Sequence, residues 1–191
     1  MPLFFSVIRK KLRVSFFEYI YYFCERRILT TKGAVKMFKF FMDIDEYKKA
    51  IKFYGEKFKL KSRWVVSIID SFSPELKMNY NSEKAIACTN WGDKTVLFKS
   101  KLLKMPKFLA RAYVRHEIRH CAQMEAIDGK MREKYGDNLS SIYTQMVIVS
   151  DNQNGYGKSM MEADAWLAFF GIYLNIDKVA NKIIKKNFLW L

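Results

Sequence analysis

The chain is short of cysteine, histidine and long apolar runs, and these shortages exclude several classes of protein. Its three cysteines, Cys24, Cys88 and Cys121, form no C-x-x-C pair, which argues against a disulfide framework and favours a reducing compartment. No stretch holds the roughly 18 consecutive apolar residues of a spanning helix. Charged residues interrupt the apolar N-terminus before a secretory signal of normal length can form. We therefore expect an intracellular, cytoplasmic protein without a transmembrane segment.

Acidic residues are also scarce, since 19 Asp and Glu stand against 34 Lys and Arg, for a formal charge of +15. Such an excess favours nucleic acid, anionic lipid or acidic protein as partner, although a solvated lysine-rich surface would have the same composition. The chain has 191 residues and is 50% hydrophobic, so it can bury one sizeable core.

Residues 1–36 form a basic and aromatic N-terminal segment, and residues 37–191 form the predicted main domain. Interleaved Arg, Lys, Phe and Tyr are typical of a helix on a membrane surface or of an arm that contacts nucleic acid. A helix packed on the domain would have the same pattern, and translation from Met37 or Met42 would remove the segment. The sequence leaves these alternatives open.

From Asp43 onward, the pattern predicts an α+β fold. Asp43 is the predicted N-cap of an amphipathic helix, and Pro106 marks the start of the helix that carries both histidines. Residues 139–149 fit either a helix or a strand. The other expected elements are a helix at 43–58, a strand at 64–69, a loop at 70–83, a hairpin of 84–89 with 95–99, the histidine helix at 106–126, and helices at 159–174 and 177–189.

Both histidines of the chain lie in the string V-R-H-E-I-R-H-C, residues 114–121. Positions i and i+4 share one face of a helix, so His116 and His120 can direct two imidazole nitrogens at one ion. Glu117 projects beside them, and in H-E-x-x-H sites this glutamate is the general base that accepts a proton from metal-activated water. The string therefore predicts a Zn²⁺ site.

A catalytic zinc site normally has three protein ligands and one position for water. Because both histidines are used, the third ligand must be a carboxylate or a cysteine, and Glu162 on the next long helix is the best candidate. Ser159-x-x-Glu162 also fits a capping box, in which the glutamate only caps its own helix. Asp164 lies about 200° around the helix from Glu162, so we expect it to support the ligands or the fold. Cys121 points away from His120 and is expected in the core.

Candidate hydrogen-bond donors for a developing oxyanion are Arg119, Tyr143 and Tyr156. The loop of residues 155–157 could present Tyr156 near the third ligand. Ordinary packing would account for each of them equally well, and Arg115 and Arg119 are also expected to form ion pairs on the flank of the helix.

His116-Glu117-x-x-His120 followed by Glu162-x-Asp164-Ala165 resembles the gluzincin branch of zinc metallopeptidases, in particular the minimal ones of phages and of ImmA/IrrE-like proteins. The resemblance covers residues 43 to about 175. It implies a zincin-like fold, in which a small mixed sheet with a free edge strand packs on the H-E-x-x-H helix and a following helix carries the third ligand.

The same resemblance implies a function and a set of site residues. The cofactor would be Zn²⁺, the substrate a peptide or protein, and the strand at 95–99 the edge that pairs with substrate. The implied metal ligands are His116, His120 and Glu162, with Glu117 as general base.

The chain also departs from related patterns, and two alternative functions remain. Trp166 stands where the thermolysin-like pattern has an Asp. SprT-like proteases, which act on DNA-bound proteins, use a third histidine that this chain lacks. One alternative is a SprT-like or ImmA-like protease of DNA-bound proteins. The other is a basic module that binds nucleic acid or a membrane surface and has a structural or vestigial zinc site.

Overall fold

The computed structural model describes residues 41–72, 85–153 and 158–187. The chain divides into two units between Phe41 and Met42, and the second unit, Met42–Leu191, is the one described below. The N-terminal segment 1–36, most of the predicted loop 70–83 and Tyr156 lie outside the described residues.

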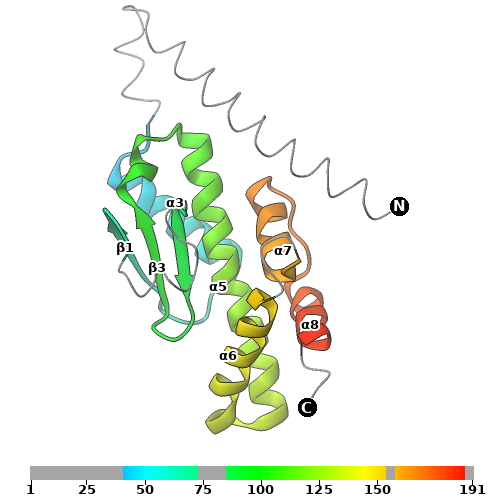
Figure 1. Ribbon diagram of the computed structural model, residues 1–191. Helices are drawn as coiled ribbons and strands as arrows, with labels where there is room; N and C mark the ends of the chain where they lie inside the picture. Colours follow the sequence, from blue (N-terminus) through cyan, green and yellow to red (C-terminus); the bar gives the residue numbers. More distant parts are fainter. Residues whose placement is uncertain (1–40, 73–84, 154–157, 188–191) are drawn as a thin grey trace, which may run out of the picture. The chain divides into compact units, whose positions relative to one another are not determined.

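The described elements follow the predicted order and form an α+β fold with a small three-stranded mixed sheet (Figure 1). The segment 139–149, which fitted helix or strand, is helical. The elements are α3 (Ile44–Lys57), β1 (Val65–Ile69), β2 (Ala87–Asn90), β3 (Thr95–Lys99), the 3-10 helix η1 (Ser100–Lys104), α5 (Lys107–Tyr135), α6 (Asp137–Gln153), α7 (Met160–Phe169) and α8 (Ile176–Asn187).

Helix α3 begins at its predicted cap. Asp43 Oδ1 accepts a hydrogen bond from the Glu46 N–H at 2.7 Å, and the Glu46 carboxylate accepts one from the Asp43 N–H, which completes a capping box. The helix buries Tyr47 and Tyr54, whereas Ile44 is 52% exposed. The helix is therefore amphipathic, as predicted, with Ile44 in its first turn outside the buried face.

Strand β3 lies in the centre of the sheet, whose order is β1-β3-β2. It pairs antiparallel with β2 through the predicted hairpin and parallel with β1 on its other side. The prediction that strand 95–99 is the free edge for substrate is therefore wrong. A hairpin leaves the outer side of either strand available, and nothing in its sequence indicates on which side β1 will pair. Among the described strands, β1 and β2 form the edges.

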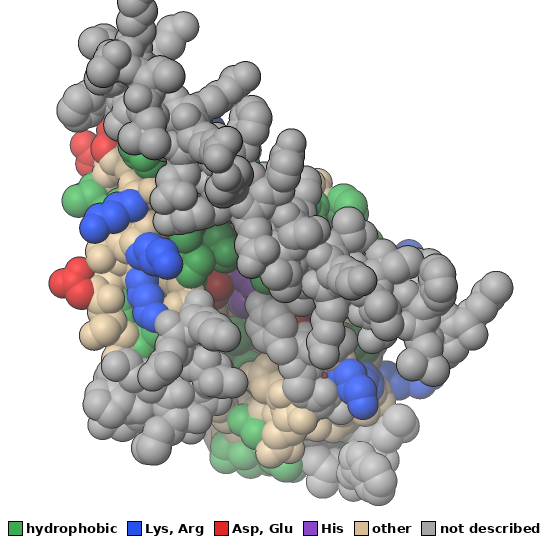
Figure 2. Space-filling model, turned by 45° about the horizontal axis from the view of Figure 1, so that its top comes forward, with side chains coloured by type: hydrophobic (Ala, Val, Ile, Leu, Met, Phe, Trp, Pro, Cys, Tyr) green, Lys and Arg blue, Asp and Glu red, His purple; other side chains and the backbone are tan. Residues whose placement is uncertain are grey.

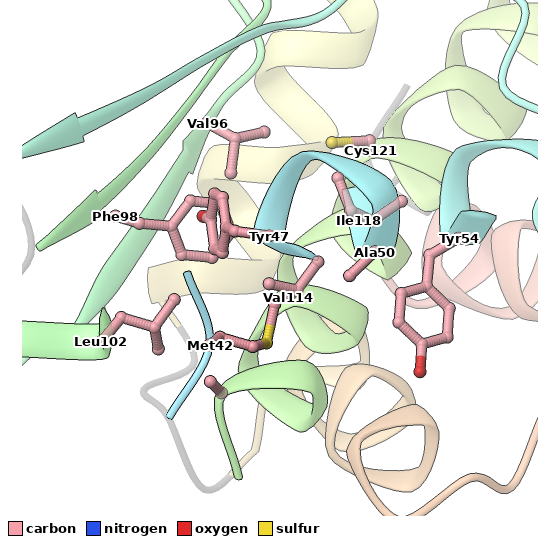
Figure 3. Close-up of a cluster of buried hydrophobic side chains, with 11 residues drawn as sticks. Met42, Tyr47, Ala50, Tyr54, Val96, Phe98, Leu102, Val114, Ile118 and Cys121 are labelled. Atoms are coloured by element: carbon pink, nitrogen blue, oxygen red, sulfur yellow. The ribbon is translucent and has the colours of Figure 1, made fainter. Parts of the chain in front are cut away.

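A first hydrophobic cluster packs α3 and the sheet against the N-terminal half of α5 (Figure 3). Val114, Ile118 and Cys121 are spaced i, i+4 and i+7 on α5, so they form one buried face. The rings of Tyr47 and Phe98 meet edge to face, with centroids 5.1 Å apart. This packing fixes the rotation of α5, and with it the directions of the remaining faces of the helix.

A second hydrophobic cluster joins the C-terminal half of α5 to α6, α7 and α8. Ile127 and Met131 of α5 lie in it, which explains why the helix continues to Tyr135 and not only to the predicted residue 126. Gly136 ends the helix at a φ of 78°. Helix α5 therefore lies between the sheet on one side and α7 and α8 on the other (Figure 1).

Helix α7 is shorter than predicted and ends at Phe169, just before Gly171, which has a φ of 86°. Across the described ranges, none of the helices combines the length and the apolar character needed to cross a bilayer.

Candidate metal centre

The three predicted ligands converge between α5 and α7. His116 Nε2 and His120 Nε2 are 3.2 Å apart, and the carboxylate oxygens of Glu162 lie 3.6 Å from the first nitrogen and 3.4 Å from the second. Two donors bound tetrahedrally at about 2.0–2.1 Å from an ion would be about 3.3–3.4 Å apart. The His116–His120–Glu162 cluster therefore has the size and the donor chemistry to hold a metal ion such as Zn²⁺.

The cluster is largely buried but reaches the surface. His116 is 4% exposed and His120 7% exposed, while Glu162 is half-buried. Figure 2 shows histidine surface recessed between hydrophobic side chains, with acidic surface close by. This position combines partial exclusion of water with access from outside.

The backbone and the side chain of Glu162 have different contacts. Its backbone N–H donates to Ser159 Oγ at 3.1 Å, so Ser159 caps α7 as predicted. Its side chain lies against the two histidines. The capping interaction fixes the first turn of α7, and the carboxylate is thereby directed at α5.

The charge of the cluster favours a bound cation. Burial alone would lower the pKa of His120, but the Glu162 carboxylate, aided by Glu117 and a hydrogen bond with Gln123, raises it to about 9. The same negative charge that retains a proton on His120 would also attract a metal ion, so protons and metal compete for this position.

Glu117 lies beside the cluster and is held by strand β2. Thr89 Oγ1 donates to Glu117 Oε2 at 2.7 Å, while Glu117 Oε1 lies 4.0 Å from His116 Nε2. Burial raises the pKa of Glu117 to about 7, with Glu162 adding to the effect and with His120 and Thr89 opposing it. The carboxyl can therefore exchange protons near neutral pH. Thr89 was not among the predicted site residues, because its contact with Glu117 depends on the packing of β2 against α5.

A buried polar network contacts His120 at Nδ1, the ring nitrogen that is not directed at the cluster. His120 Nδ1 lies 2.8 Å from Gln123 Oε1, and Gln123 Nε2 donates to Asp164 Oδ2 at 2.7 Å. Arg119 Nε donates to the same Asp164 oxygen at 2.7 Å. Asp164 therefore faces away from Glu162, as its position on the helix predicted. Gln123 was missed, although it lies three residues after His120 and hence near the same face of α5.

Arg119 forms the predicted ion pair, but in the interior and not on an exposed flank. Its side chain is 4% exposed and also donates to the Leu174 carbonyl at 2.8 Å. These contacts tie its guanidinium to α7 and to the segment after it. The other oxyanion candidates gain no support, because Tyr143 packs against Tyr135 with ring centroids 4.3 Å apart and Tyr156 is outside the described residues.

Asp151 of α6 anchors the start of α7, a role that the sequence analysis missed. Its carboxylate accepts hydrogen bonds from Ser159 Oγ at 2.6 Å and from the backbone N–H groups of Met160 at 3.2 Å and Met161 at 3.0 Å. Asn187 Nδ2 donates to it from α8 at 3.1 Å. Asp151 therefore satisfies donors at the first turn of the helix that carries Glu162.

Two further residues near the cluster have clear roles. Cys121 is buried, as predicted, and burial raises the pKa of its thiol well above the ordinary value. Trp166 meets the His116 ring at a centroid distance of 4.8 Å. This residue, which departs from the thermolysin-like pattern, therefore supplies packing to a candidate ligand.

Comparison of the chain with protein-family models, curated proteins and solved structures gives no match. Its function must therefore be inferred from the chemistry of the site.

Proposed function

We propose that the protein is a zinc-dependent metallopeptidase that acts in the cytoplasm and has a zincin-like arrangement of sheet and helices. His116, His120 and Glu162 would bind Zn²⁺, and Glu117 would be the general base. The observation that carries the proposal is the position of a buried carboxylate, Glu117, whose Oε1 lies 4.0 Å from His116 Nε2, directly beside a cluster of two histidines and one glutamate.

The proposed chemistry assigns separate tasks to the two oxygens of Glu117. Zn²⁺, when bound, would polarise the substrate carbonyl and lower the pKa of a water molecule at the site. Oε2 is held by Thr89, so Oε1, the oxygen on the His116 side, would accept the proton from that water. The same carboxyl would then return this proton to the leaving amine.

A peptide substrate is favoured by the neighbouring sheet. Among the described strands, β2 has a partner on one side only, and its residue Thr89 contacts the proposed base. Extended peptides bind by adding a strand to such an edge. A peptide paired with β2 would therefore lie near Glu117. This role belongs to β2 and not to the central strand β3.

The proposal is tested with the Glu117→Gln variant. Purified wild-type protein should contain about one zinc per chain and should cleave an unfolded protein such as denatured casein. Glu117→Gln should retain the zinc and lose cleavage, because an amide cannot accept the proton. Glu133→Gln, an exposed change on the same helix, is the matched control and should behave like wild type. Absence of zinc uptake, or full cleavage by Glu117→Gln, would refute the proposal.

The alternatives predicted from the basic N-terminal segment can be distinguished with the same purified protein. A protease of DNA-bound proteins would cleave only when DNA is added. A nucleic-acid-binding module would bind DNA in a salt-sensitive manner, and this binding would survive His116→Ala.

A further inference from the structure

We infer that Gln123 is a positioning residue for the metal centre: it fixes the His120 ring with its proton on Nδ1, so that Nε2 is the ligand atom. Asp164 and Arg119 in turn fix the orientation of the Gln123 amide. The inference rests on the proposed zinc site and adds to it a determinant of metal affinity.

The partners of Gln123 fix the orientation of its side-chain amide. Gln123 is fully buried at 0% exposure, so its amide must find hydrogen-bond partners within the protein. Two acceptors flank one end of it: the Met161 carbonyl at 3.0 Å and Asp164 Oδ2 at 2.7 Å. The amide NH₂ group must occupy this end, since a carbonyl oxygen would meet two other oxygens there. In the opposite orientation, Gln123 Oε1 would face the Met161 carbonyl and Asp164 Oδ2 with no hydrogen between these oxygens.

The contact with Gln123 determines which nitrogen of the His120 ring carries the proton. The remaining end of the amide is Oε1, which only accepts hydrogen bonds, and it lies 2.8 Å from His120 Nδ1. Nδ1 must therefore carry a proton. In the neutral imidazole, the lone pair is then on Nε2, the atom that lies 3.4 Å from the Glu162 carboxylate. The hydrogen bond thus selects the tautomer that can bind a metal within the cluster.

Arg119 holds Asp164 in place. Arg119 donates to both of its oxygens, from Nε at 2.7 Å and from one terminal nitrogen at 3.1 Å. This pairing fixes the position of the carboxylate that accepts the hydrogen bond from Gln123. Glu162 and Asp164 both belong to α7, so one helix supplies a ligand directly and orients a second ligand through Gln123.

The consequence is measured as zinc affinity. Gln123→Met keeps the length of the side chain but removes both hydrogen-bonding ends. Loss of such a partner typically weakens metal binding about 10–100-fold, and we expect this loss in competition titrations with a chelator. Gln145→Met, the same change at an exposed position of α6, should leave zinc affinity unchanged. Thermal unfolding of the metal-free variants checks that both are folded.

A second measurement needs no variant. The chain contains two histidines, so the ¹⁵N imidazole spectrum of the zinc-loaded protein has two rings to assign. We expect the His120 proton on Nδ1 and the metal on Nε2.

The outcomes separate this inference from the proposed function. A proton on Nε2, or wild-type zinc affinity in folded Gln123→Met, would overturn the role of Gln123 while leaving the metallopeptidase proposal intact. Failure of the wild-type chain to take up zinc would overturn both. If Gln123→Met does not fold, the spectrum of the wild-type protein decides.

Discussion

Thr89 Oγ1 donates a 2.7 Å hydrogen bond to Glu117 Oε2 and joins the edge strand β2 to the helix that carries both histidines. The bond holds one carboxylate oxygen and leaves the other on the side of His116. A strand that would bind substrate and a residue that would activate water are thereby held in fixed register.

Replacement of Thr89 by Val should shift the pH dependence of cleavage. The hydroxyl stabilises the ionised form of Glu117, so its removal raises the pKa of that carboxyl. The base is then protonated at a higher pH, and cleavage falls off earlier as the pH is lowered. We expect the acid limb of kcat/KM, measured across pH 5–9, to move to higher pH by about one unit. Thr89→Ser retains the hydroxyl and should keep the wild-type profile; identical profiles for Val and Ser would contradict the assignment.

Glu162→Gln should weaken zinc binding by more than the roughly 10–100-fold typical of changes outside the direct ligands. The change removes a negative charge that lies 3.4 Å from His120 Nε2 and 3.6 Å from His116 Nε2. Helix content should not change, because Ser159 still accepts the hydrogen bond of the capped N–H. Chelator competition and circular dichroism measure the two effects. Unchanged zinc affinity would show that Glu162 acts only within its own helix.

The metal-free protein should lose stability as the pH rises from about 4.5 to 9. Burial raises the pKa of Glu117 from 4.5 to about 7, so the folded state loses stability through ionisation of this carboxyl between these two pH values, and the loss is complete above about pH 7. The pKa of His120 is raised from 6.5 to about 9 against the effect of burial, mainly by Glu162, so its stabilising contribution is complete below pH 6.5 and disappears as the pH passes 9. Both groups bind more protons in the folded state, which gives the two effects the same sign.

Thermal unfolding in EDTA at pH 5, 7 and 9 measures this dependence. The decrease in Tm between pH 5 and 7 should be smaller in Glu117→Gln, which removes the group that ionises in this interval but keeps the other charges of the chain. Excess zinc should reverse the trend, because metal binding requires deprotonated ligands and stabilises the folded state. A Tm in EDTA that depends on pH equally in wild type and variant would contradict the assignment to Glu117.

Asp151→Ala should destabilise the protein by about 3 kcal/mol, since the side chain is fully buried and its loss leaves several donors at the start of α7 without an acceptor. Asp177→Ala, an exposed change on α8, should remain within about 0.5 kcal/mol of wild type. Urea unfolding of the two variants provides the comparison. A loss below about 1 kcal/mol would mean that Asp151 does not anchor α7.

Local spacing was sufficient to predict part of this site. His116 and His120 share a face because their separation of four residues is a property of any α-helix. Asp43 was identifiable as a cap for the same reason, since its partner lies three residues away. Glu162 was expected as the third ligand because both histidines are used and the next long helix carries it, and the family resemblance implied the same residue; its proximity depends on the packing of α7 against α5.

The features that the sequence analysis missed depend on contacts between distant segments. Thr89 reaches Glu117 across 28 residues, and Gln123 reaches Asp164 across 41. The parallel pairing of β1 with β3, which made the edge-strand prediction wrong, is equally non-local. Periodicity and capping patterns report the neighbourhood of a residue along the chain, so they cannot identify these partners.

The most direct test of the central claim is a crystal structure of the zinc-loaded protein with anomalous data collected at the zinc edge. The account predicts one peak bound by His116 Nε2, His120 Nε2 and a Glu162 carboxylate oxygen, at distances of about 2.0–2.2 Å. No peak at this position, or a zinc ion there whose third protein ligand is a residue other than Glu162, would contradict it.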